Sequence, residues 1–188
     1  DLVPKGNYVY IGGDITANNA KLLKQGVFQV LKPYIDQGDI TVVYDQWTEN
    51  WDPEIAYLHM KEALETNDNN IDAVIAANDG TAGGAIRALR EKGLEGKIPV
   101  AGQDAELSAV QRIVQTMTVY KPISQLTEAA AELAIKLANN EHIEVTSKIN
   151  NGKLEVPAVL LSPIEVNKSN IVETIIADGF HRKEEVYQ

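Results

Sequence analysis

Cysteine is absent from all 188 residues, which excludes disulfide bonds, thiolate metal sites and cysteine nucleophiles. Basic residues are also few, because 17 Lys and Arg stand against 27 Asp and Glu, giving a formal net charge of -10. A charge of this sign repels phosphate backbones and anionic lipids. We therefore expect no nucleic-acid partner.

Long apolar runs are missing as well. No stretch approaches the roughly 20 apolar residues that cross a bilayer. The chain opens on Asp1-Leu2-Val3-Pro4, without the basic and apolar regions of a signal peptide. Any export signal is therefore expected to lie outside this sequence. Since 44% of the residues are hydrophobic, the chain can still bury a core.

Strand-like and helix-like segments alternate four times along the chain. This alternation predicts βαβ units and an α/β fold with a doubly wound, Rossmann-like parallel sheet. We expect strands over 8–11, 40–44, 73–77 and 98–101, each followed by a helix. Further on we expect an edge strand or a crossing segment over 116–120, an alanine-rich helix over 123–139, a turn at 150–152 and an apolar strand over 157–161. The tail from Val166 shows no clear period.

Polar and aromatic residues follow each predicted strand. In an open parallel sheet the ligand crevice lies at the carboxyl ends of the strands, so these residues are binding candidates. Together they offer amides, carboxylates, a cation and indole faces, the mixture that a neutral polyol needs. They are Asp14, Asn18, Asn19, Asp45, Gln46, Trp47, Trp51, Asn78, Asp79, Gln103, Asp104 and Lys121.

Each candidate also has a purely structural explanation. Asn78 belongs to a residue type that tolerates unusual backbone conformations, and Lys121 to one that is usually solvated. One of Trp47 and Trp51 is expected to pack and the other to stack on a ligand, and spacing alone does not decide between them. The remaining candidates of this kind are suited to cap a predicted helix: Asn18, Asn19, Asp79 and Asp104.

Motifs for catalysis and for phosphate or metal binding are missing. No G-x-x-x-x-G-K-[ST] loop occurs, Gly12-Gly13 lacks the third glycine of a dinucleotide fingerprint, and Gly83-Gly84 falls inside a predicted helix. We therefore expect no catalytic residue, no metal and no cofactor. Asp79 and Asp104, which follow the third and fourth strands, could act as an acid–base pair on a glycoside, and this function is kept as an alternative. No metal-ligand spacing connects the three histidines, expected at the surface: His59, His142 and His181.

Five segments carry a family likeness. They are Asn18-Asn19-Ala20-Lys21, Asp45-Gln46-Trp47, Ala77-Asn78-Asp79 with Thr81-Ala82-Gly83-Gly84-Ala85, Gly102-Gln103-Asp104, and Thr116-Met117-Thr118-Val119-Tyr120-Lys121-Pro122. Together they resemble the D-xylose-binding members of the periplasmic sugar-binding proteins that serve ABC importers. The resemblance runs from Asp1 to about Phe180 and includes 167–171.

The resemblance implies a type I periplasmic binding protein fold, similar to that of the ribose-binding protein, with two lobes and the sugar between them. By this comparison 1–121 is the C-terminal lobe and 122–150 a crossover helix and segment of the other lobe. A return strand, 151–166, and a C-terminal tail, 167–188, complete the chain. The first lobe is missing from this sequence, so we expect that lobe or a second chain against helix 123–139. The link over 112–116 looks shorter than the family pattern.

The resemblance also assigns site residues. It implies sugar contacts from Asn19, Trp51, Asn78, Asp104 and Lys121, with Trp51 rather than Trp47 stacking on the ring. The secondary candidates are Asn18, Trp47, Asp79 and Gln103.

The function that the resemblance implies is capture of D-xylose outside the cytoplasm and delivery to the membrane subunits of an ABC importer, without chemistry. A membrane sensor kinase is a less common client, which makes a xylose sensor partnered with a histidine kinase an alternative. Another alternative is the sugar-sensing effector core of a lac-repressor-type regulator, which requires a helix-turn-helix upstream. A sugar-modifying enzyme is the third, and turnover of labelled xylose would reveal it.

Overall fold

The computed structural model describes residues 4–112, 116–145 and 147–188. Contacts divide the chain into two units, which are described separately below. The first unit comprises Asp1–Tyr120 and Glu165–Gln188, and the second comprises Lys121–Ile164. None of the helices in the described ranges is long and apolar enough to span a bilayer.

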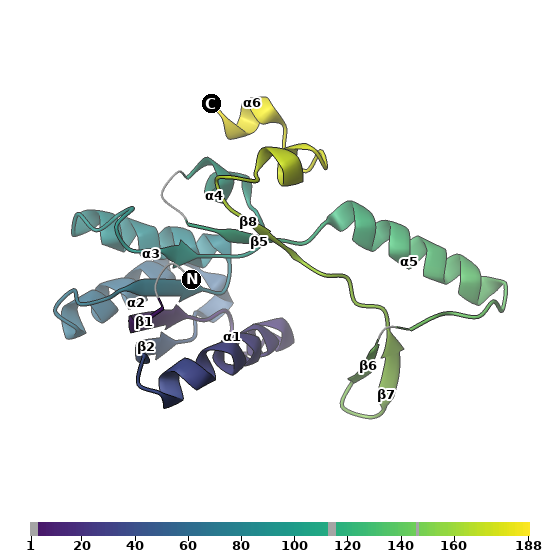
Figure 1. Cartoon of the computed structure of the whole chain (residues 1–188), viewed down its shortest axis with the longest axis horizontal. Helices are drawn as coiled ribbons and strands as arrows, with labels where there is room; N and C mark the ends of the chain where they lie inside the picture. The colour runs from purple at the N-terminus through teal and green to yellow at the C-terminus, as the bar shows by residue number, and fades with distance from the viewer. Residues whose placement is uncertain (1–3, 113–115, 146) are drawn as a thin grey trace. The chain divides into compact units, whose positions relative to one another are not determined.

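A four-stranded parallel sheet forms the centre of the first unit (Figure 1). Its strands are β1 (Gly6–Ile11), β2 (Ile40–Gln46), β3 (Ala73–Ala76) and β4 (Val100–Ala101), in the order β2-β1-β3-β4. Each neighbouring pair is parallel, as the alternation of segments predicts. The chain turns from one side of β1 to the other between β2 and β3, so the topological switch point lies between β1 and β3.

Helices cover both faces of this sheet, which confirms the doubly wound prediction. On one face α1 (Asn18–Asp36) packs Leu31 against Tyr8 and Ile40. On the other face lie α2 (Pro53–Thr66) and α3 (Asp79–Glu91), which contact each other closely. The residues that face them alternate along β1 with those that face α1, the period of two expected of a strand. The apolar residues of this second core include Val9, Ile11, Met60, Leu64, Val74, Ile86 and Leu89.

The contact between α2 and α3 explains the glycine pair inside a helical pattern. A Cβ on Gly84 would lie 2.2 Å from the carbonyl oxygen of Pro53, so only glycine permits this approach. Pro53 is the first residue of α2, as predicted, and the carboxylate of Asp52 caps that helix by accepting from the amide of Glu54 at 2.8 Å. The first turns of α2 and α3 are therefore held at a fixed spacing.

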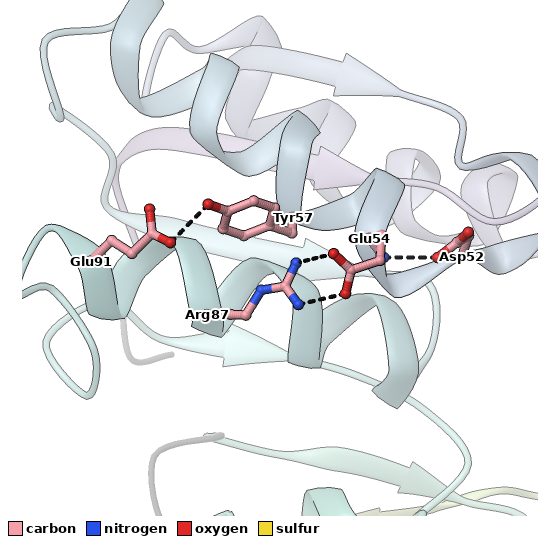
Figure 2. A network of polar contacts seen from close by, with 5 residues as sticks. All are labelled: Asp52, Glu54, Tyr57, Arg87 and Glu91. Carbon is pink, nitrogen blue, oxygen red and sulfur yellow. Dashed lines mark hydrogen bonds and ion pairs between the residues drawn. The ribbon is translucent and has the colours of Figure 1, made fainter.

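Polar contacts on the surface of the same helix pair support this spacing (Figure 2). Both guanidinium nitrogens Nη1 and Nη2 of Arg87 donate to the carboxylate of Glu54, at 2.5 and 2.6 Å. The guanidinium also lies 4.0 Å from the ring centroid of Tyr57, whose hydroxyl donates to Glu91 at 2.7 Å. Hydrogen bonding to Arg87 lowers the pKa of Glu54. Because such exposed pairs are worth little each, close packing at Gly84 is the stronger constraint.

A second, short sheet carries the chain back into the first unit. In it β5 (Thr118–Tyr120) pairs with β8 (Ile164–Val166). Helix α4 (Leu107–Gln111), the π-type turn η2 (Val172–Ile176) and α6 (Lys183–Val186) complete the unit. The tail is thus ordered by buried Ile175 and Val186, although its sequence shows no period. The expected short link over 112–116 falls largely outside the described residues.

The second unit consists of α5 (Ile123–Ala138) and an antiparallel hairpin of β6 (Ser147–Asn150) and β7 (Glu155–Ala158). The predicted turn lies in this hairpin, with Gly152 at a φ of 90°. The predicted strand over 157–161 is wrong, because β7 ends at Ala158 and the strand that pairs with β5 starts only at Ile164. No residue of α5 is buried, and Leu137 is 66% exposed. The assignment of 122–150 to another lobe stays a prediction.

Candidate functional site

Trp51 contacts Gly13, which lies in the loop after β1. A Cβ on Gly13 would lie 2.3 Å from the Cη2 and Cζ3 atoms of the Trp51 ring. Because residue 13 is glycine, the six-membered ring of the indole can pack directly against the backbone. Among the described residues no aromatic ring or cation covers the Trp51 ring, and the residue is half-buried. Its position suits stacking on a flat apolar surface.

Trp47 is half-buried, like Trp51, but its ring also has a cation beside it. Its Cε3 atom lies 3.0 Å from where a Cβ on Gly12 would be, and the ammonium of Lys24 lies 4.6 Å from its ring centroid. Its carbonyl oxygen accepts from Nε2 of His59 at 3.0 Å. Gly12 and Gly13 thus allow two tryptophan rings to pack against the backbone, Trp47 at Gly12 and Trp51 at Gly13. This arrangement supports Trp51 as the stacking residue. His59, which was expected at the surface, is half-buried and hydrogen-bonded.

Asp14 connects the loop after β1 to the short helix η1 (Glu49–Trp51) that carries Trp51. Its Oδ2 accepts from the amide of Asn50 at 2.6 Å, and its Oδ1 accepts from the amide and hydroxyl of Thr16 at 2.7 and 2.5 Å. Hydrogen bonding from Thr16, followed by that from Asn50, holds the pKa of Asp14 below its usual range. Asp14 was only a general polar candidate from sequence, and no local pattern indicates this connection over 36 residues.

Asn18 and Asn19 are the first two residues of α1, and both are exposed. The N-cap is Ala17, and no side chain caps the helix, so the capping alternative for either asparagine is wrong. Neither side-chain amide makes a hydrogen bond within the described residues. Both are thus available as donors and acceptors at the positive end of α1.

Asn78 begins α3 as its N-cap. Its Oδ1 accepts from the amide and the hydroxyl of Thr81, both at 2.8 Å, which fixes the orientation of the side-chain amide. Its backbone is extended, with φ of −150° and ψ of 176°, so the unusual conformation considered from sequence does not occur. The amide nitrogen Nδ2 makes no hydrogen bond within the described residues. Asn78 can therefore cap the helix and donate to a ligand at the same time.

Asp79 does not cap α3, which corrects the alternative stated from sequence. Its carboxylate is fully buried and its Oδ2 accepts from the hydroxyl of Thr118 and the amide of Glu106, both at 2.9 Å. Its own amide donates to the carbonyl of Gln103 at 2.8 Å. Asp79 thus connects the loop after β3 with the loop after β4 and with β5.

Asp104 and Gln103 occupy the loop after β4, and both are half-buried. The N-cap of α4 is Glu106, so the capping alternative for Asp104 is also wrong. Asp104 has a φ of 100°, and its amide donates to the carbonyl of Val119 on β5 at 2.8 Å. Lys121 directly follows β5, is exposed, and is the first residue of the second unit.

The loops that carry the candidates of the first unit are joined at the carboxyl edge of the sheet. The amide of Thr48 donates to the carbonyl of Gly13 at 3.0 Å and joins the loops after β1 and β2, as Asp79 and Gln103 join those after β3 and β4. The edge therefore carries an indole ring, side-chain amides and a carboxylate, and their contacts to a ligand stay a prediction. Nowhere in the described ranges do three or more acidic, His or Cys side chains form a metal site. His181 is also engaged, since its Nε2 lies 2.8 Å from the carbonyl oxygen of Ala105.

Comparisons with known proteins identify the family of this chain. The model of a family described as "Periplasmic binding protein domain" matches residues 1–142. The D-xylose-binding periplasmic protein of Escherichia coli (strain K12) is 52% identical over 99% of this chain and 57% of its own length. The D-xylose-binding periplasmic protein of Haemophilus influenzae is 54% identical over 98% of this chain and 56% of its own length.

Solved structures show the same fold. An ABC transporter solute-binding protein from Clostridium phytofermentans with bound β-D-glucose superposes with a TM-score of 0.82 at 25% identity, over 99% of this chain and 61% of that one. A carbohydrate transporter solute-binding protein from Chloroflexus aurantiacus in complex with D-glucose gives 0.81 at 27% identity, over 96% and 62%. The chain spans less than two thirds of each of these proteins.

Proposed function

Since this chain belongs to the periplasmic binding protein family, we propose that it supplies one wall of an extracytoplasmic D-xylose site in a protein that delivers the sugar to an ABC importer. The two xylose-binding relatives support the choice of sugar, because their identity of 52–54% extends over nearly the whole chain. The chain spans about 57% of the Escherichia coli relative, so the proposal concerns the longer protein that contains it.

The observation that carries the proposal is the set of side chains at the carboxyl edge of the sheet. Trp51, seated on Gly13, offers an apolar face of the size of a pyranose ring. Asn78 offers its free Nδ2 to a hydroxyl, and Asp104 offers a carboxylate that can accept from two neighbouring hydroxyls. With Asn19 these residues provide both donors and acceptors. The contact expected from Lys121 stays a prediction.

We assign the opposite wall of the site to the part of the longer protein that corresponds to the remaining length of the relatives. Helix α5 supports this assignment, because its apolar side chains Leu126 and Leu137 are 41% and 66% exposed in this chain. An apolar stripe of this kind on a soluble protein normally has a partner surface. The 188-residue chain alone should therefore bind xylose weakly, since one wall excludes little water from its hydrogen bonds.

No reaction is part of the proposal, because no residue in the set is arranged as a nucleophile with a base. Asp79, the carboxylate that would have to pair with Asp104 in acid–base chemistry, is fully buried and accepts two hydrogen bonds. Incubation of labelled xylose with the protein should return the sugar unchanged.

Calorimetric titration of the longer protein with D-xylose, D-ribose, L-arabinose and D-glucose tests the proposal. We expect one xylose per chain and weaker binding of the other three sugars. Asp72→Asn is a matched control, because Asp72 accepts from the amide of Asn7 at 2.7 Å at the opposite end of β1. It should lower stability and leave xylose affinity unchanged. Absence of heat with xylose would contradict the proposal.

A further inference from the structure

Two aspartates at the candidate site turn their carboxylates into the protein. Asp14 is 9% exposed and Asp79 is 0% exposed. Each follows the end of a central strand, Asp14 after β1 and Asp79 after β3, on either side of the switch point. Both are placed where ligand contacts were expected from sequence, yet each accepts several hydrogen bonds from protein groups.

Each aspartate lies beside a pair of residues with strained backbone. Asn50 and Trp51 have φ of 53° and 57°, and Asp104 and Ala105 have φ of 100° and 52°. This left-handed region is uncommon for residues other than glycine, and a tryptophan there is exceptional. Strain of this kind persists only where surrounding contacts hold it. The two pairs carry Trp51 and Asp104, the proposed stacking residue and the proposed carboxylate ligand.

The hydrogen bonds of Asp14 hold the first pair. Its Oδ2 accepts from the amide of Asn50 at 2.6 Å, at the residue where the backbone turns left-handed. Its Oδ1 is fixed by Thr16 within the loop after β1, so the carboxylate cannot rotate away without losing those bonds. The Asn50-Trp51 turn is thereby fixed to the loop after β1, in which Gly13 contacts the Trp51 ring.

Asp79 holds the second pair through Thr118. The Thr118 hydroxyl donates to Asp79 Oδ2 at 2.9 Å and accepts from the amide of Ala105 at 3.1 Å, so its single proton and one lone pair are both used. The amide of Glu106 donates to the same carboxylate oxygen at 2.9 Å. The backbone on the C-terminal side of Asp104 is therefore fixed by two successive amides.

We propose that Asp14 and Asp79 are positioning residues, which hold the two left-handed pairs so that Trp51 and Asp104 face the sugar in a preformed arrangement. This inference deepens the proposed function and rests on it for the identity of the sugar. The placement of Trp51 itself does not depend on any sugar. It can therefore be tested separately.

The sugar-independent test uses Trp47→Phe in the 188-residue chain, where it leaves Trp51 as the single tryptophan. In this background Asp14→Asn replaces one of the two carboxylate oxygens by an NH2 group, which cannot accept a hydrogen bond. The side chain can then no longer accept from both Asn50 and Thr16. We expect red-shifted emission and stronger acrylamide quenching of Trp51, whereas Asp72→Asn should change neither. Unchanged quenching in Asp14→Asn would overturn the role of Asp14. Should Asp14→Asn not fold, Asp14→Ser, which is too short to reach Asn50, takes its place.

The binding test uses rescue in the longer protein. Asp14→Asn should raise the xylose dissociation constant about tenfold, the loss expected for a hydrogen bond to a charged group. Adding Asn50→Gly should recover much of that loss, because glycine adopts the left-handed region without strain. If Asp14→Asn weakened binding only by destabilising the whole fold, adding Asn50→Gly would not restore xylose affinity. Absence of any recovery in the double variant would overturn the proposal.

Thr118 provides the corresponding test for Asp79. Thr118→Val and Asp79→Asn should each weaken xylose binding, and the double variant should lose no more than the worse single one, because both break the same connection. Thr118→Ser, which keeps the hydroxyl, should bind as the unaltered protein does. Additive losses would overturn the role of Asp79. If the unaltered protein binds no xylose, the proposed function fails, and the quenching of Trp51 still decides the role of Asp14.

Discussion

Gly13→Ala is the substitution for which the structure gives the most direct prediction. The new Cβ would lie 2.3 Å from two atoms of the Trp51 ring, whereas carbon atoms in contact lie about 3.5–4.0 Å apart. The ring would have to move by more than about 1 Å to restore that contact. Because the Asn50-Trp51 backbone is already left-handed, it has little freedom to follow. The stacking face should therefore be lost while the sheet stays intact.

The expected cost is that of one stacking contact, about 1–1.5 kcal/mol or roughly tenfold in the dissociation constant for xylose. Calorimetry on the longer protein measures this loss, and circular dichroism confirms that the fold persists. Gly26→Ala is the matched control, because no heavy atom lies within 4 Å of its added Cβ in the middle of α1. It should stabilise the protein by about 0.8–1 kcal/mol and leave affinity unchanged. If Gly13→Ala bound xylose with full affinity, the proposed stacking role of the Trp51 ring packed on Gly13 would be refuted.

Four further outcomes can be measured. Trp51→Ala should weaken xylose binding more than Trp47→Ala in a fluorescence titration, and equal losses would remove the assigned roles. Asp104→Ala should cost at least about 2 kcal/mol by calorimetry; an unchanged affinity would exclude a contact. Because the pKa of Asp14 is lowered in the folded state, its stabilisation is present above the unfolded-state pKa and lost as pH falls through the folded-state pKa. The difference in urea stability between the protein and Asp14→Asn should therefore shrink below about pH 4, and a constant difference would contradict this. Gly84→Ala, with a Cβ 2.2 Å from a carbonyl oxygen, should lower stability by about 1–3 kcal/mol in urea unfolding.

The sheet could be predicted because its strands are locally distinct. Continuous apolar runs such as 73–76 lie between helical patterns that end at glycine, so the number and type of elements follow from the sequence. The run over 157–161 misled because apolar character alone does not choose a strand partner. Its first residues pair with β6, whose sequence Ser147–Asn150 has little apolar character. Pairing between distant segments is decided by the whole fold.

The candidate set could be predicted from position, since the carboxyl ends of parallel strands converge. The individual role of each residue in that set could not be predicted. Asn78 rather than Asp79 caps α3 because Thr81, three residues later, completes a capping box, and this spacing is visible in the sequence. The engagement of Asp14 with Asn50 and of Asp79 with Thr118 joins residues 36 and 39 positions apart. No local pattern reports such pairs.

The most direct test of the account is a titration of the longer protein with D-xylose, observed through Trp51 in a variant that carries Trp47→Phe and retains no other tryptophan. The account predicts a saturable change in Trp51 emission at one xylose per chain, which Asp104→Ala shifts to much higher sugar concentration and Asp72→Asn does not. Xylose binding that leaves Trp51 emission unchanged would contradict the placement of the sugar at this edge of the sheet.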